Sequence, residues 1–293
     1  MKLALRIEVA TLRGAQRDAP RLAAMLKSLG AGATFLFNLG PDHTGRALGS
    51  LPRVPKLKCY GAAALLSGTL QPAADVGARC GGEMRAVRDE GFEAGILAWD
   101  RANWIRRVAR ADESWTAAAM RRARDRFETV FGGPALTHGA PNWQMNRYAF
   151  RYTQRLGFLH CSDTRGTGPF LPVVNGELVS CPQLPTTLPT LDELLAAGLN
   201  PDEIVRRLLE LSRKPPPPGH VYTARAEVEG TVYEPVLRAL LAGWRELDQQ
   251  PVALRDYAAG LDLARLPRRV VVEQPMPGAR RAVSSEGKEF LAP

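Results

Sequence analysis

Histidine and cysteine are scarce in this sequence, which has four of each among its 293 residues. The four cysteines, Cys59, Cys80, Cys161 and Cys181, are far apart and form no CxxC pair, which argues against a zinc knuckle. In a reducing compartment such residues are most simply free thiols in the core. We therefore expect no structural metal site or disulfide framework from the cysteines.

Long apolar stretches are also missing. No run approaches the roughly 18–20 apolar residues that cross a bilayer, so the sequence predicts no transmembrane helix. The N-terminus begins like a signal peptide, but Arg6 and Glu8 interrupt its apolar run after three residues. We expect this segment to be the first strand of a cytoplasmic protein.

Acidic residues are outnumbered, with 30 Asp and Glu against 39 Lys and Arg, and the formal net charge is +9. This balance favours partners that carry phosphate, such as nucleic acid, an anionic membrane surface or a phosphorylated lipid. The alternative is arginine-rich codon usage without a functional meaning. No predicted helix combines basic and aromatic residues as a nucleic-acid reader does, so we predict no nucleic-acid partner.

What the sequence does contain is a regular alternation of strand and helix patterns. With 45% hydrophobic residues, the chain can bury a substantial core. The expected strands cover residues 2–9, 33–39, 92–99, 136–140, 158–163, 220–228 and 251–254; the expected helices cover residues 18–29, 82–90, 114–130 (with Ser114 as N-cap), 147–156, 202–214 and 234–247. Short connections between them indicate an α/β fold whose parallel sheet is closed, or nearly closed, by helices.

We expect one α/β domain over residues 1–262. Residues 263–293 are rich in proline and arginine and predict a loosely attached C-terminal tail. An insertion at about residues 48–74 interrupts the alternation, with Arg53, Lys56 and Lys58 before the apolar stretch Cys59–Leu66. This insertion can lie in a membrane interface or form a flap over a cleft.

Six segments, spread in order over nearly the whole chain, resemble a known family. They are LRIEVATLRG from residue 5, TFLFNLGPDHTGRAL from residue 34, EAGILAWDRANW from residue 93, CSDTRGTGPFLP from residue 161, LPTTLPTLDEL from residue 184 and VYTARAEVEG from residue 221. The chain resembles the NodB-type polysaccharide deacetylases, and among them the deformylases that act on undecaprenyl-phosphate-linked 4-formamido-arabinose in lipid A modification. This resemblance implies a distorted (β/α) barrel of the NodB homology type, with its site at the C-terminal face of the strands.

The family's chemistry implies a divalent metal held by an Asp and two His, an Asp as general base and a late His as general acid. This sequence departs from every one of these positions. Glu8 stands at the position of the base and Arg225 at that of the acid, while Ala10, Leu97 and Arg101 stand at the ligand positions. These departures predict no intact catalytic group and no metal or other cofactor. In a further motif, Gln144 and Asn146 match an Arg and an Asp of the family.

Arg101 and Arg225 bring two permanent positive charges to the expected place of the metal. We hypothesise that a guanidinium replaces the metal electrostatically and pairs with Glu8. The alternative is that both arginines point to solvent. A relocated metal site built from His138 and His160 also stays open, although none of the four histidines has a partner four residues away.

Several substrate-contacting parts of the family are matched here, and the resemblance implies substrate-binding roles for Trp99, Asp100, Trp143, Asp163, Arg165, Thr187 and Glu227. Tight turns and internal ion pairs would look the same in sequence.

Three functions remain. The leading hypothesis is an inactive homologue that binds a lipid-linked or phosphorylated sugar, or that serves as a non-catalytic partner of an active deacetylase paralogue. The second is a metal-independent amide hydrolase with Glu8 as base and Arg225 or Arg101 as oxyanion donor. The third is a scaffold protein in peripheral contact with an anionic membrane. In each case we expect a cytoplasmic chain, free or on the cytoplasmic face of the inner membrane.

Overall fold

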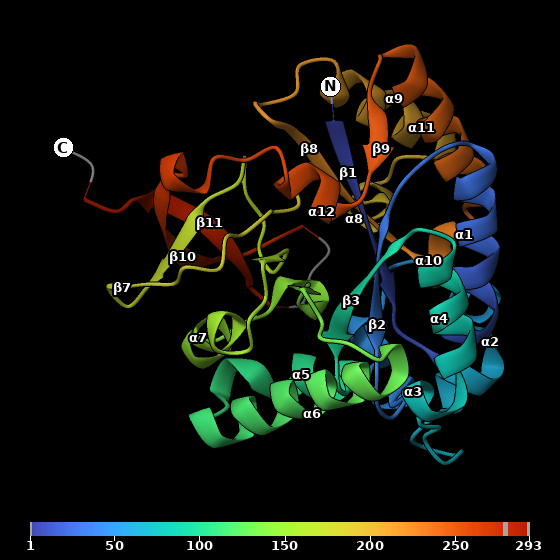
Figure 1. Cartoon of the computed structure of the whole chain (residues 1–293). Coiled ribbons are helices and arrows are strands. Elements are labelled where there is room, and N and C mark those ends of the chain that lie inside the picture. Colours follow the sequence, from blue (N-terminus) through green and yellow to red (C-terminus); the bar gives the residue numbers. More distant parts are fainter. Residues whose placement is uncertain (1, 278–280, 292–293) are drawn as a thin grey trace.

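The computed structural model describes residues 2–277 and 281–291. Its main element is a seven-stranded parallel sheet with the order β5-β4-β3-β2-β1-β8, in which β9 also pairs with β1 (Figure 1). The strands are β1 (Lys2–Val9), β2 (Thr34–Asn38), β3 (Glu93–Ala98), β4 (Thr137–His138), β5 (His160–Cys161), β8 (Gly219–Arg225) and β9 (Gln250–Val252). The sheet is a half-barrel, which confirms the predicted α/β fold of the NodB type.

Amphipathic helices cover the outer face of the sheet. The longer ones are α1 (Ala19–Ser28), α4 (Gly81–Asp89), α6 (Glu113–Phe131), α7 (Arg147–Arg155), α9 (Pro201–Ser212) and α11 (Glu234–Glu246). The prediction of Ser114 as the N-cap of α6 was wrong. Asp112 caps this helix, because its carboxylate accepts a hydrogen bond from the Trp115 amide at 2.8 Å.

Short helices follow several strands at their carboxyl ends. They are α2 (Lys56–Leu66), α3 (Val76–Arg79), α5 (Arg101–Arg107), α8 (Leu191–Ala196), α10 (Ala226–Glu229) and α12 (Leu254–Ala258), with single 3₁₀ or π turns over Gly14–Asp18, Thr44–Ser50, Val108–Arg110, Pro141–Trp143 and Leu263–Arg265. The strand predicted for residues 220–228 ends early, at Arg225. The Glu229 carboxylate accepts the Arg225 amide at 2.9 Å, which turns the chain into α10.

A second sheet lies beside the barrel, with the strand order β11-β10-β6-β7. It combines β6 (Leu171–Val174) and β7 (Glu177–Leu178) with β10 (Arg268–Gln274) and β11 (Val283–Glu289). The two last strands come from the segment predicted as a loose tail, and that prediction was wrong. β10 pairs in parallel with β6, and the Glu286 amide donates to the Arg165 carbonyl at 2.8 Å.

The two faces of the half-barrel differ in chemistry. Side chains between sheet and helices form one large apolar cluster, which includes Phe35, Phe37, Tyr222 and Trp244. The barrel interior instead holds buried polar groups, among them Arg6, Glu8, Thr223 and Arg225. Because successive side chains of a strand point to opposite faces of the sheet, each strand contributes residues both to the apolar cluster and to the polar interior.

The insertion predicted at residues 48–74 packs beside the strand ends through a few anchors. Within α2, Gly61 adopts a φ of 77° that kinks the helix, while Cys59, Tyr60 and Ala64 are buried. All four cysteines are free and buried, as expected. No helix in the described part of the chain has the length and apolarity to cross a membrane.

Candidate functional site

The positions that match the family's metal and catalytic residues meet at the carboxyl ends of the strands. Glu8 on β1 lies directly opposite Arg225 on β8 in the parallel register. Ala10, just after β1, packs with Leu97 of β3 and with Leu36 in a small buried apolar cluster. Methyl groups therefore occupy the side of the site where two metal ligands are implied.

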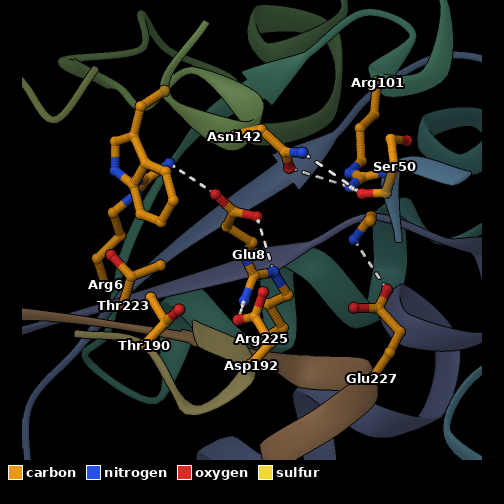
Figure 2. A network of polar contacts seen from close by, with 12 residues as sticks. Arg6, Glu8, Ser50, Arg101, Asn142, Thr190, Asp192, Thr223, Arg225 and Glu227 are labelled. Atoms are coloured by element: carbon orange, nitrogen blue, oxygen red, sulfur yellow. Dashed lines mark hydrogen bonds and ion pairs between the residues drawn. The ribbon is translucent and has the colours of Figure 1, made fainter. Parts of the chain in front are cut away.

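Glu8 is held between two guanidinium groups (Figure 2). Nη2 of Arg6 donates to Oε1 of Glu8 at 2.8 Å, and Nε of Arg225 lies 3.6 Å from Oε2. Arg225 also pairs with Asp192 through Nη1. The expected pairing of Arg225 with Glu8 is present in the structure, at ion-pair distance.

Arg225 is a permanent cation in this setting. Burial alone lowers its pKa, but the nearby carboxylates of Asp192 and Glu8 more than offset that effect. The resulting pKa lies above the ordinary value for arginine. The site therefore has a fixed positive charge at any physiological pH.

Arg6 is the site residue that the sequence reading missed. Its side chain is fully buried, and Nη2 also donates to the Ala140 carbonyl at 3.0 Å. Burial lowers the pKa of Arg6, while Glu8 raises it. The Arg6 side chain can lie against the backbone of residue 139 because that residue is glycine: a Cβ there would lie 2.9 Å from Nε of Arg6. The spacing of Arg6 and Glu8 could have identified Arg6 as a site residue, because residues i and i+2 of a strand point to the same face.

Arg101 does not take part in the charge cluster around Glu8, contrary to the hypothesis. Its Nη2 donates to Oδ1 of Asn142 at 3.2 Å and to the Ser50 carbonyl at 3.3 Å. The side chain is buried, so the alternative that it points to solvent is also wrong. Nη1 of Arg101 has no hydrogen-bond partner among the described residues.

A cavity of about 240 Å³ opens above Arg225. Its wall comprises residues 46, 47 and 49–52, Ile105 and Arg106 of α5, residues 142–144, Asp192 and Arg225, together with Met276, Pro277 and Arg281 from the connection between β10 and β11 and Val283 of β11. Four arginines face a single carboxylate in this lining, so the cavity favours an anionic ligand.

The backbone of the cavity wall is strained at one point. Asn142 and Trp143 have φ values of 52° and 50°, a left-handed conformation that non-glycine residues rarely adopt. The Trp143 indole is buried, donates to Oγ1 of Thr186 at 3.0 Å and stacks against the Arg165 guanidinium at 4.9 Å. Such strain persists only where surrounding contacts hold it, and it concentrates at ligand sites.

Of the predicted substrate-binding residues, only Trp143 lines this cavity. Asp163 is fully buried, where it accepts hydrogen bonds from His138 and from the Ala140 amide. Glu227 is buried too, and it accepts the amides of Ala10 and Thr11 at 2.8 Å each. These carboxylates brace the backbone of the site and lie out of reach of a ligand.

The other four predicted positions are also used internally. Thr187 hydrogen-bonds Nδ1 of His220 at 2.9 Å. Asp100 caps α5 and binds Nδ1 of His43 at 2.7 Å. Arg165 donates to the Leu188 carbonyl at 3.0 Å, and the Trp99 ring lies 5.3 Å from the Arg126 guanidinium.

A relocated metal site built from His138 and His160 does not form. His138 pairs with Cys161 in the register of β4 and β5, so the neighbouring His160 points to the opposite face. His160 binds Glu93 at 3.1 Å instead.

Among the described residues, His138, Cys161 and Asp163 are close enough together to be considered as ligands. Their polar atoms already form hydrogen bonds with one another and with neighbouring groups. Asp163 holds His138 and the Ala140 amide, and Cys161 lies 3.5 Å from the Cys181 thiol. The residues of the site thus do not fit the metal that the resemblance implies, because zinc sites need three or four free donors.

The half-barrel has the fold of polysaccharide deacetylases and family 4 proteins of known structure. A polysaccharide deacetylase-type protein of Mycobacterium smegmatis superposes with a TM-score of 0.64, 16% identity and 94% coverage of both chains. A family 4 pseudoenzyme of Bacillus anthracis gives a TM-score of 0.54 at 10% identity, covering 88% of this chain and 65% of that one. These likenesses show the fold.

Relatives that are similar in sequence identify a narrower family than the fold does. A 4-deoxy-4-formamido-L-arabinose-phosphoundecaprenol deformylase (ArnD) of Shewanella sediminis is 31% identical over 255 residues, which is 84% of this chain and 82% of the relative. A second one, of Wigglesworthia glossinidia brevipalpis, is 26% identical over 231 residues, covering 75% and 80%. No protein-family profile matches the chain. The chain belongs to the family of these deformylases.

Proposed function

We propose that this member of the deformylase family has lost metal-dependent catalysis and retains a pocket for a lipid-linked or phosphorylated sugar. One observation carries the proposal: Glu8 is clamped between Arg6 and Arg225 where the family's metal chemistry would take place. The carboxylate is already neutralised by two guanidinium groups, so it has little left to offer a dication.

The apolar part of the site supports the same proposal. Ala10 and Leu97 have no donor atoms, and Arg101 repels a cation. Amide hydrolysis in this family depends on a metal to polarise the carbonyl and activate water. With one carboxylate in place of a ligand set, neither step has the groups it needs.

The charge of the cavity supports an anionic ligand. Arg46, Arg106 and Arg281 line it together with Arg225, and guanidinium groups bind phosphate oxygens in a bidentate manner. The relatives are named for a phosphoundecaprenol-linked sugar. We therefore infer a sugar that carries a phosphate group, and a cytoplasmic protein that meets it at the inner membrane, alone or as the non-catalytic partner of an active paralogue.

The geometry disfavours the metal-independent hydrolase. A general base must reach the water it activates, but Glu8 is 1% exposed and its Oε1 is bound by Arg6. Arg225 is likewise engaged by Asp192.

The test combines metal analysis, turnover and binding on the purified chain. We expect no stoichiometric zinc, no formate released from undecaprenyl-phosphate-linked 4-formamido-arabinose in detergent, and saturable calorimetric binding of arabinose 1-phosphate. Arg106→Ala with Arg281→Ala should weaken that binding at least about tenfold, since each hydrogen bond to a charged group contributes roughly 1.5–3 kcal/mol. Arg238→Ala, in a different cavity, is the matched control. Zinc at one ion per chain together with formate release would refute the proposal.

A further inference from the structure

The insertion has a charge composition unlike the rest of the chain. Residues 48–74 contain three basic residues and no Asp or Glu, although the whole chain has 30 acidic residues. The side chains of Arg53, Lys56 and Lys58 form no ion pair within the described part of the chain. Their charge is therefore available to an outside partner.

Large apolar side chains stand exposed among these cations. Leu57, between Lys56 and Lys58 at the start of α2, is 66% exposed, and Leu70 is 83% exposed. Leu70 occupies a turn closed by the bridge between Ser67 and Gln71. Leu57 and Leu70 therefore present apolar groups to solvent within one basic stretch of the chain.

The turn that carries Leu70 is braced from below. The Gly68 amide donates to the Gln71 carbonyl at 2.8 Å, and Oγ of Ser67 donates to the Asp42 carbonyl at 2.6 Å. Gly68 has a φ of 79° and faces His43 so closely that a Cβ would lie 2.5 Å from its ring. A braced turn presents its leucine without further ordering on binding, which keeps the entropic cost of docking low.

The turn that carries Leu70 adjoins the cavity wall, because the Arg46 side chain, which lines the cavity, donates to the Gly68 carbonyl. Residues 49–52, just before Arg53, line the cavity as well. α2 and α3 lie beside the strand ends, on the part of the molecule away from the N-terminus (Figure 1).

We infer that residues 53–58 and 67–71 form a docking surface for an anionic lipid bilayer, with Leu57 and Leu70 inserted between head groups and Arg53, Lys56 and Lys58 held at the phosphates. Unpaired cations around protruding leucines are the composition of an interfacial anchor. A protein interface is depleted of lysine, whereas Lys56 and Lys58 flank Leu57 here. The inference rests on the proposed function, because the ligand proposed there reaches the cavity from a membrane.

The experiment is co-sedimentation of the full chain with vesicles, in the absence of any sugar. We expect binding to vesicles that contain phosphatidylglycerol, weaker binding to phosphatidylcholine alone and a loss of binding in high salt. Removing each cation should weaken binding about fivefold, which corresponds to roughly 1 kcal/mol per Lys or Arg near the surface. Lys56→Glu with Lys58→Glu tests the charge, and Leu57→Glu with Leu70→Glu, each expected to cost about tenfold, tests the insertion.

Matched controls lie at the opposite end of the barrel. Leu159→Glu alters another exposed leucine, just before β5, and Lys214→Glu reverses an exposed cation in the connection before β8. Both should sediment with vesicles like the parent chain. Equal loss in test and control variants, or no binding to anionic vesicles at all, overturns the inference.

A separate measurement distinguishes this inference from the proposed function. Calorimetry with arabinose 1-phosphate, without vesicles, should give the same affinity for Leu57→Glu/Leu70→Glu as for the parent, since neither leucine lines the cavity. Sugar phosphate binding without vesicle binding would overturn the docking surface and leave the function standing. Vesicle binding without sugar phosphate binding would do the reverse.

Discussion

Glu8 is the residue on which the charges of the site depend. It is the carboxylate shared by Arg6 and Arg225, and all three side chains are nearly inaccessible to water. Removing one member of a buried charge cluster leaves the others without compensation, which costs far more than the cluster contributes in net stability. Stability and local charge are therefore coupled at this one position.

Glu8→Gln should lower the free energy of unfolding by about 3–5 kcal/mol, because two buried guanidinium groups lose their counter-charge. Urea unfolding followed by circular dichroism measures the change. Glu289→Gln, in an exposed pair with Arg269, should change it by less than about 0.5 kcal/mol. A Glu8→Gln chain as stable as the parent would show that the ion pairs of Glu8 do not persist in solution.

Asp18 gives the chain a pH dependence of its own. Burial, and then the nearby Glu227 carboxylate, raise its pKa to about 7. The folded state then binds a proton that the unfolded state releases between the ordinary pKa of Asp and pH 7, so this contribution to stability falls as the pH rises through that window. Asp18→Asn, which cannot ionise, should reduce the loss of stability between pH 5 and pH 8. Urea midpoints at the two pH values measure it, and an unchanged loss in the variant would contradict the assignment.

At the scale of elements, the C-terminal hairpin is the part that completes the cavity. β10 extends the second sheet through β6, and Val283 at the start of β11 reaches the cavity wall. The segment between them contributes Met276 and Pro277. Ligand binding thus depends on the docking of this hairpin as well as on the barrel.

Val283→Asp should detach the start of β11, because an unpaired carboxylate would be buried where the valine is 2% exposed. We expect a loss of at least about 2 kcal/mol of stability and of arabinose 1-phosphate binding. Val232→Asp, at a residue that is 40% exposed, is the control and should bind normally. Normal binding by Val283→Asp would mean that the hairpin is dispensable.

The strands and helices of the barrel could be predicted because their signals are local. Residues 2–9 alternate and are rich in β-forming residues, residues 33–39 are a short apolar run, and the structure has β1 and β2 there. The strands β10 and β11 could not be predicted as part of the fold, since only pairing with β6, about a hundred residues earlier, makes them a sheet.

The candidate site could be predicted only in part, and from a different kind of signal. The pairing of Glu8 with Arg225 followed from a resemblance that aligns both positions. The roles of Asp163 and Glu227 could not be predicted in this way, because a carboxylate that binds backbone amides looks the same in sequence as one that faces a ligand.

At the scale of the whole molecule, the chain aligns with the deformylases over most of its length, at 31% and 26% identity. At the positions implied for metal ligands it has Ala10, Leu97 and Arg101. A structurally similar family 4 pseudoenzyme, at 10% identity, is described as a mutant with restored activity. Mutation has therefore restored activity in that protein.

We expect Glu8→Asp, Ala10→Asp, Leu97→His, Arg101→His and Arg225→His together to hold about one zinc ion per chain, because they supply three ligands and remove two competing cations. Elemental analysis after dialysis measures the metal. Leu97→His with Arg101→His alone, which lacks the aspartate, should retain much less. Equal zinc in the parent chain would contradict the prediction.

The clamp of Arg6 and Arg225 on Glu8 has a consequence for the conditions under which the pocket keeps its charge. An enzyme of this fold that depends on a bound ion loses its central positive charge to chelators and in a cell starved of zinc. A guanidinium is part of the polypeptide and is made with it. The pocket of this chain is thus charged from the moment it folds, whatever the supply of trace elements.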